Sequence, residues 1–154
     1  NGSLVHHCVD VSNRDSVQVL FDWVQSEVGE IDILVNSAGL ARHAPATDTT
    51  QADYDAVTDL NVKAAYFLTR AVANRLIDAG KSGSLINISS QMGHVGGLDR
   101  AVYCATKHAL EASDHKSDPP HGRQEEVSEV DSDAHVALHT VVLNHKLAAI
   151  EHYS

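Results

Sequence analysis

The alternation of short apolar runs with longer amphipathic stretches is the feature that most constrains how this chain can fold. Apolar runs at residues 4–9, 31–35 and 84–88 have the length and composition of buried strands. Between them, apolar residues recur at helical spacing over residues 17–28 and again over residues 54–76. Strands that alternate with helices predict an α/β fold with a doubly wound parallel sheet, so we expect a partial sheet of three strands with intervening helices.

Residues with special backbone chemistry predict where the first elements begin and end. Asp10, Ser12 and Asn13 follow the first apolar run and are typical of a turn and a helix cap. Gly29 stands where the first helix is expected to end. The apolar run at residues 31–35 has no polar alternation, so we expect a parallel strand covered on both faces.

Two further helical stretches are expected after the second apolar run. The helical pattern over residues 54–76 is long enough to hold two helices run together, and it ends before Gly80. A glycine-rich turn at residues 93–97 precedes the last expected helix, over residues 101–111.

Composition excludes several classes of protein. With 43% hydrophobic and 21% charged residues among 154, the chain has the balance of one globular domain. A formal net charge of -10 disfavours a nucleic-acid partner, and no apolar stretch approaches the roughly 18 residues of a membrane span. Cys8 and Cys104 fall inside an expected strand and an expected helix, as small core residues of a protein in a reducing compartment. We therefore expect a cytoplasmic location.

The amino-acid composition of the chain changes abruptly around Ala112. We expect a catalytic core over residues 1–112 and an atypical acidic, histidine-rich tail over residues 113–154. Residues 114–133 carry almost no apolar periodicity and are expected to be solvated or disordered, whereas residues 135–150 fit either a strand or a helix. A break of this kind is what a shifted reading frame would produce.

Histidines in the tail raise the question of a metal site, and His135 and His139 are four residues apart. No cysteine and no pair of closely spaced ligands accompanies them, so we expect no metal site. The histidines concerned are His115, His121, His135, His139 and His145.

The strongest chemical signal is the pair Tyr103 and Lys107 in an expected helix, with Ser90 thirteen positions before the tyrosine at the end of an expected strand. The spacing of four places the phenol and the ammonium on one face of the helix. A phenol is a poor acid or base near neutral pH, but a nearby cation stabilises the phenolate and lowers its pKa. A serine hydroxyl beside them could donate a hydrogen bond to a substrate oxygen as charge develops there.

Four sequence elements together resemble one family, the short-chain dehydrogenases/reductases, from about Leu4 to Glu111. Residues 36–39, Asn-Ser-Ala-Gly, resemble its Asn-Asn-Ala-Gly signature with serine in the second place. Residues 86–90, Ile-Asn-Ile-Ser-Ser, and the Tyr103-x-x-x-Lys107 spacing resemble its active-site signatures, and Asn61 lies in a Leu-Asn-Val context within the long helix.

The resemblance implies a role for each matching residue. Tyr103 would be the general acid/base, Lys107 would lower its pKa and hold the nicotinamide ribose, and Ser90 would polarise the substrate carbonyl. Asn61 would hold a water that links Lys107 to solvent. Residues that would contact the cofactor are Asp10 and Val11, at the adenine, and Asn36, Ala38 and Gly39, along its length.

Several of these residues also have a simpler interpretation. Asp10 could cap the following helix, Gly39 could serve only the turn, and Asn61 could satisfy a buried backbone group. The adjacent Ser89 competes with Ser90, which is preferred because its interval to Tyr103 matches the family.

The chain also departs from the family at both ends. The glycine-rich phosphate loop of the family would lie before Asn1, so we expect a fragment in which a preference for NAD or NADP cannot be read. After Glu111, neither the family's next strand nor its Pro-Gly loop can be recognised. For the parent protein the resemblance implies hydride transfer between NAD or NADP and a small alcohol or ketone, and a homodimer or homotetramer. The alternative is a truncated, non-catalytic domain that binds no cofactor and at most self-associates.

Overall fold

The computed structural model describes residues 4–113 and the strand at residues 136–141. Its elements follow the order α1 (Arg14–Glu27), β1 (Ile33–Asn36), α2 (Gln51–Thr58), the π-helix η1 (Asp59–Ala64), α3 (Ala65–Asp78), β2 (Gly83–Ile88), the 3-10 helix η2 (Gln91–Gly93), α4 (Ala101–Ser113) and β3 (Val136–Val141). Among the described residues, no helix combines the length and the apolar character that crossing a bilayer requires.

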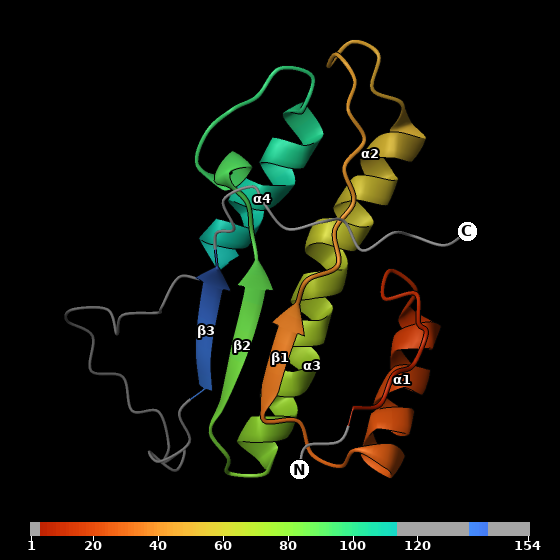
Figure 1. Cartoon of the computed structure of the whole chain (residues 1–154), viewed down its shortest axis with the longest axis vertical. Coiled ribbons are helices and arrows are strands. Elements are labelled where there is room, and N and C mark those ends of the chain that lie inside the picture. Colours follow the sequence, from red (N-terminus) through yellow and green to blue (C-terminus); the bar gives the residue numbers. More distant parts are fainter. Residues whose placement is uncertain (1–3, 114–135, 142–154) are drawn as a thin grey trace, which may run out of the picture.

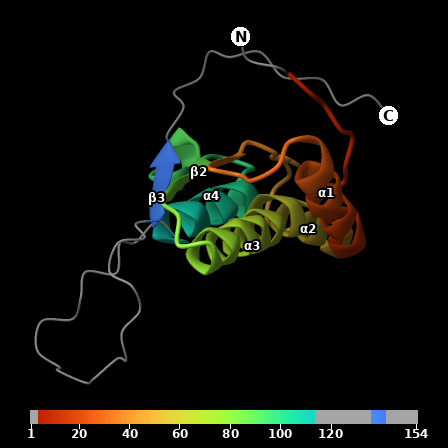
Figure 2. The same cartoon turned by 90° about the horizontal axis from the view of Figure 1, so that it is seen from below.

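The three strands form one parallel sheet in the order β1-β2-β3 (Figure 1). In its register Asn36 lies opposite Asn87, and Ile88 lies opposite Val141. The helices form a single layer over one face of this sheet (Figure 2), and α3 contacts all three strands. The predicted α/β class with a parallel sheet is confirmed.

The prediction of a first strand at residues 4–9 is wrong. These residues form no strand, Leu4 is 97% exposed, and Cys8 is exposed instead of buried, whereas Cys104 is buried as predicted. A strand gains its stability from hydrogen bonds to a neighbour, and no described strand pairs with this segment. It lies instead along α1, where His7 stacks on Trp23 with ring centroids 4.7 Å apart.

The prediction that the strand within residues 31–35 is covered on both faces is also wrong. Ile33 and Val35 of β1 are 62% and 51% exposed, while Leu34 packs against the core. Successive side chains of a strand point to opposite faces, and the described helices cover only one of them. The other face of β1 is therefore open in the described part of the chain.

Of the two alternatives for residues 135–150, the structure describes a strand, β3, which pairs in parallel with β2 along its whole length. The third strand of the sheet thus comes from the tail and not from residues 4–9. The predictions for residues 114–133 lie outside the described residues, as do those for His115, His121, His135 and His145 and for the side chain of His139.

Local chemistry accounts for the limits of α1. The side chain of Asn13 accepts hydrogen bonds from the backbone N–H groups of Asp15 and Ser16 and so caps the helix. Gly29 follows the helix with φ of 95°, a conformation that glycine adopts without the strain of a side chain. Both limits were predicted.

The core lies between α1, α3 and the sheet. Its buried residues are Phe21, Leu68, Val72, Leu76 and Leu85, and the guanidinium of Arg75 lies 4.1 Å from the centroid of the Phe21 ring. Helical spacing in α1 and α3 places these apolar residues on the faces that meet the strands. This packing holds β1 and β2 in place, so their carboxyl ends are firmly positioned.

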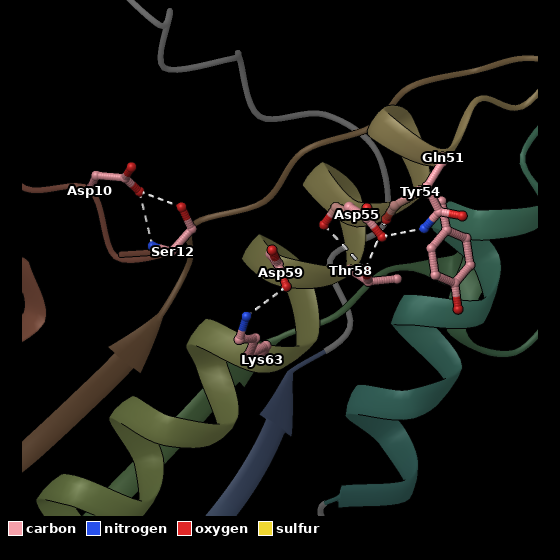
Figure 3. A network of polar contacts seen from close by, with 8 residues as sticks. All are labelled: Asp10, Ser12, Gln51, Tyr54, Asp55, Thr58, Asp59 and Lys63. Carbon is pink, nitrogen blue, oxygen red and sulfur yellow. Dashed lines mark hydrogen bonds and ion pairs between the residues drawn. The ribbon is translucent and has the colours of Figure 1, made fainter. Parts of the chain in front are cut away.

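Helices α2 and α3 are joined through η1 into one continuous helical run, in agreement with the prediction of two helices run together. Thr50 caps the start of α2 by accepting a hydrogen bond from the N–H of Asp53. Contacts between residues four apart continue along the run into η1, from Gln51 to Asp55 and from Lys63 to Asp59 (Figure 3). A π-helix is rare in proteins, and it often occurs at functional sites.

Candidate active site

The carboxyl ends of β1 and β2 place two loops at the same edge of the sheet. Residues 37–50 follow β1 and residues 89–100 follow β2, and α4 lies beside both loops (Figure 1). In parallel α/β sheets this edge is where ligands bind. The candidate residues from both signatures are found here.

Tyr103 and Lys107 lie one turn apart on α4, as the spacing predicted. The Lys107 ammonium is 5.7 Å from the centroid of the Tyr103 ring, and Lys107 is only 5% exposed. Its Nζ donates a hydrogen bond of 2.8 Å to the backbone carbonyl of Ile88, the last residue of β2. Burial lowers the pKa of Lys107, and the carboxylate of Glu111 acts in the opposite direction.

Gly39 lies beside this ammonium. A Cβ atom at position 39 would be 3.8 Å from Lys107 Nζ and 3.8 Å from Asn61 Oδ1. Glycine therefore leaves open the space between the loop after β1, helix α4 and η1. The structure brings together Gly39, Asn61, Tyr103 and Lys107 from three separate parts of the chain.

Asn61 is 1% exposed, and both the oxygen and the nitrogen of its side-chain amide are hydrogen-bonded. Its Oδ1 accepts a hydrogen bond from the N–H of Leu40 at 2.8 Å, and its Nδ2 donates to the carbonyl of Leu40 at 2.9 Å and to Thr106 Oγ1 at 3.0 Å. Asn61 thus satisfies the backbone groups of Leu40, which agrees with its simpler interpretation, and its part in holding a water stays a prediction. The π-helical conformation at Asn61 was not predicted from the sequence.

Ser90 stands two residues after the end of β2 and is 8% exposed. Its hydroxyl oxygen accepts a hydrogen bond of 3.2 Å from the N–H of Met92 and so caps η2. The neighbouring Ser89 donates a long hydrogen bond of 3.4 Å to the carbonyl of Lys107. The two serines therefore have different surroundings, with Ser89 directed at the backbone of α4.

Among the residues expected along a cofactor, Asn36 is held by the protein itself. Its Nδ2 donates to Asn87 Oδ1 and to Thr69 Oγ1, each at 2.9 Å, which links β1 to β2 and α3. Ala38, by contrast, is exposed on the loop after β1. Residues 37–39 are thus the exposed part of this signature, which a ligand can reach.

Asp10 and Val11 lie before α1, and no described contact joins them to Tyr103 or Lys107. Asp10 Oδ1 accepts hydrogen bonds from the backbone N–H and the hydroxyl of Ser12 (Figure 3), and these bonds lower the pKa of the Asp10 carboxyl. The alternative that Asp10 caps α1 is wrong, because Asn13 occupies that position. Val11 packs against the core cluster.

Two residues near the site were missed from the sequence. Glu111 lies one turn beyond Lys107 on α4, its Oε1 atom is buried without a hydrogen-bond partner, and His94 Nε2 is 3.6 Å away. His43, in the loop after β1, lies against Tyr103 with the two rings perpendicular. The spacing of four from Lys107 was a usable signal for Glu111, whereas nothing local pointed to His43. Across the described residues, His, Cys, Asp and Glu form no group suited to a metal ion.

Comparison with known proteins identifies relatives of this chain. A D-threitol dehydrogenase of Mycolicibacterium smegmatis is 41% identical over 98 residues, which cover 64% of this chain and 37% of that protein. A 2-dehydro-3-deoxy-D-gluconate 5-dehydrogenase of Escherichia coli is 39% identical over 98 residues, with 64% and 39% covered. The chain thus spans about two fifths of the length of these curated relatives.

Two solved structures of similar fold are also those of dehydrogenases. A 4-hydroxyisoleucine dehydrogenase complexed with NADH superposes with a TM-score of 0.65 at 33% identity, covering 69% of this chain and 47% of that one. For a gluconate 5-dehydrogenase from Burkholderia cenocepacia in complex with NADP and tartrate the TM-score is 0.63 at 34% identity, with 68% and 41% covered. The model of the short chain dehydrogenase family matches residues 1–117. The chain therefore belongs to the short-chain dehydrogenase family.

Proposed function

We propose that the protein is an oxidoreductase that uses NAD or NADP to interconvert a secondary alcohol and a ketone, with Tyr103 as the general acid/base. The observation that carries this proposal is the buried ammonium of Lys107, 5.7 Å from the Tyr103 ring and hydrogen-bonded to Ile88. A tyrosine hydroxyl can give and take back a proton, and the lysine one turn away places a positive charge beside it at the edge of the sheet.

Each further residue has a proposed part in the reaction. In the direction of reduction, Tyr103 gives its proton to the substrate oxygen while Ser90 donates a hydrogen bond to that same oxygen. Lys107 holds the nicotinamide ribose, and Asn61 holds a water that returns the proton from solvent. The buried, fully bonded amide of Asn61 favours action through the position of η1 and Leu40 rather than through a free side chain.

The residues present fit a nicotinamide cofactor at the edge of the sheet. The space that a Cβ of residue 39 would fill, 3.8 Å from Lys107 Nζ, is open because the residue is glycine. When bound, the nicotinamide would supply or accept the hydride. We propose that the backbone of Asn36, Ala38 and Gly39 follows the cofactor and that Asp10 and Val11 contact its adenine.

Relatives support a small alcohol or ketone as the substrate. Several of them are named as polyol dehydrogenases, for D-threitol, galactitol and sorbitol, and one is named an acetoacetyl-CoA reductase. Two solved relatives are complexed with NADH and with NADP, which supports one of these two as the cofactor. The cytoplasmic location and the homodimer or homotetramer stay predictions.

Replacing Tyr103 by phenylalanine tests the proposal. The change removes the proton donor and keeps the ring, so we expect oxidation of 2-butanol or 2,3-butanediol, followed as NADH or NADPH absorbance, to fall about 100- to 10,000-fold. Binding of the reduced cofactor, followed by nicotinamide fluorescence, should stay within threefold. The matched control is Tyr66→Phe, at a tyrosine that is 59% exposed on α3. Near-normal turnover by the Tyr103→Phe variant would contradict the mechanism.

The second candidate function is a non-catalytic domain that self-associates. It is favoured by the open face of β1, where Ile33 and Val35 are more than half exposed. Titration of the purified chain with NADH and NADPH separates the two candidates, because saturable binding of neither leaves only the non-catalytic one. Sedimentation of the same sample would then report whether the chain self-associates.

A further inference from the structure

His43 has an exposed imidazole placed directly beside the proposed acid/base. Its ring centroid is 6.2 Å from that of Tyr103, and the two rings are perpendicular at 85°. Among the described residues, neither ring nitrogen of His43 takes part in a hydrogen bond or ion pair. An imidazole with both nitrogens available therefore borders the Tyr103 side chain.

The chain holds His43 in this place through both of its neighbours. On one side, the guanidinium of Arg42 is paired with Asp53 in the first turn of α2. On the other side, the N–H of Ala44 donates a hydrogen bond of 3.0 Å to the carbonyl of Asp99, in the loop that leads into α4. These two anchors fix the loop after β1 relative to the helix that carries Tyr103.

The second anchor depends on an uncommon backbone conformation. Asp99 has φ of 56°, and it is the one non-glycine residue with positive φ in the described part of the chain. Aspartate tolerates this region better than most residues, but the conformation is still less stable than an ordinary one. Backbone strain of this kind occurs preferentially at binding and catalytic sites.

We propose that His43 is a specificity-determining residue that binds a second hydroxyl of the substrate, on the carbon next to the reacting carbon. The inference rests on the proposed function, because it places the reacting oxygen on Tyr103. A substrate whose reacting oxygen bonds to the Tyr103 hydroxyl can present its neighbouring hydroxyl to His43 through a hydrogen bond of about 2.8 Å.

The chemistry of the site favours a hydroxyl over a carboxylate. A neutral imidazole has one donor and one acceptor nitrogen, and a hydroxyl likewise both donates and accepts. A substrate carboxylate would need a permanent cation, but the adjacent Arg42 is already paired with Asp53. The substrate class is therefore a vicinal diol or an α-hydroxy ketone.

The test compares 2,3-butanediol with 2-butanol as substrates of the full chain. The measured quantity is the ratio of kcat/KM for the diol to that for the mono-alcohol. We expect His43→Leu to lower this ratio about 5- to 10-fold, the effect of one lost hydrogen bond, and His43→Gln to restore much of it. The matched control is His6→Leu, the same chemical change in the exposed segment before α1. An unchanged ratio in His43→Leu would overturn the proposal.

A binding measurement keeps the inference separate from the proposed function. The chain is prepared with isotope-labelled histidine and titrated with each alcohol in the presence of NAD, and its NMR spectrum is recorded. The imidazole signals of His43 are assigned by their loss in His43→Leu. We expect the diol to shift these signals at about fivefold lower concentration than 2-butanol; equal response to both overturns the inference. If the wild-type chain turns over neither alcohol, the proposed function fails for this chain and the binding result alone decides. A selective response to 3-hydroxybutyrate would assign a carboxylate and also overturn it.

Discussion

Asn61 and Leu40 are joined by two hydrogen bonds, one to the N–H and one to the carbonyl of the same residue, at 2.8 and 2.9 Å. An amide side chain that pairs with both backbone groups of one residue replaces the pairing that a strand would provide. The loop after β1 is thereby fixed to η1, and Gly39 is held next to Lys107. A buried asparagine in a helix thus positions the loop at the active site.

Replacing Asn61 by alanine should destabilise the protein and loosen this loop. The change removes the partner of the partly buried N–H and carbonyl of Leu40 and one of the two partners of the buried Thr106 hydroxyl, so we expect the free energy of unfolding to fall by about 3 kcal/mol. Urea unfolding measures this. Asn74→Ala, at an exposed asparagine of α3, is the control and should change it by less than about 0.5 kcal/mol.

The buried ammonium of Lys107 should make stability depend on pH. Burial lowers the pKa of Lys107 in the folded protein, so between the folded and the unfolded pKa the unfolded chain binds more protons. The free energy of unfolding therefore gains a term that increases with pH and is lost as the pH falls through the folded pKa. In Lys107→Met this term is absent, although Ile88 loses its donor at every pH.

We therefore expect the wild-type protein to gain stability relative to Lys107→Met as the pH rises from about 8 to about 10, towards the ordinary pKa of lysine. Urea unfolding of both proteins across this range gives the difference directly. A difference that stays constant or falls with rising pH would show that Lys107 is not held in a desolvated environment.

The features that could be predicted from the sequence are those caused by residues close together in the chain. Asn13 and Gly29 mark the limits of α1 through their own backbone chemistry, and the spacing from Tyr103 to Lys107 places both on one helix face whatever surrounds the helix. Residues 4–9 have the composition of a strand but form none, because pairing requires a neighbour that composition does not report.

Contacts between distant segments explain the rest. His43 contacts Tyr103, sixty positions later in the chain, and its neighbour Ala44 bonds to Asp99, fifty-five positions away along the chain. The hydrogen bonds of the Asn61 side chain could not be predicted before Leu40 was placed beside it. The strand β3 was one of two alternatives until its pairing with β2 was visible.

Leu76 should be a strong determinant of stability. It is 3% exposed in the core cluster, and its side chain packs against Gly83 at the start of β2. Leu76→Ala removes the apolar contacts and leaves a cavity, so we expect the free energy of unfolding to fall by about 3 kcal/mol. The neighbouring Ile77 is 50% exposed, and Ile77→Ala serves as the control, with an expected loss below about 1 kcal/mol in the same urea unfolding experiment.

Gly93 should tolerate no side chain, because it separates two buried groups of the site. A Cβ atom there would be 2.8 Å from Ser89 Oγ, closer than real contacts come, and 3.0 Å from Glu111 Cγ, tighter than most. Ser89 is buried and Glu111 Oε1 has no exposed surface, so relieving these contacts requires the side chain of Ser89 or Glu111 to change its conformation within a packed region. We expect Gly93→Ala to lower the free energy of unfolding by about 2 kcal/mol. Gly96→Ala is the matched control in the same loop, since a Cβ at position 96 meets nothing within 4 Å, and equal unfolding free energies for the two variants would contradict the prediction.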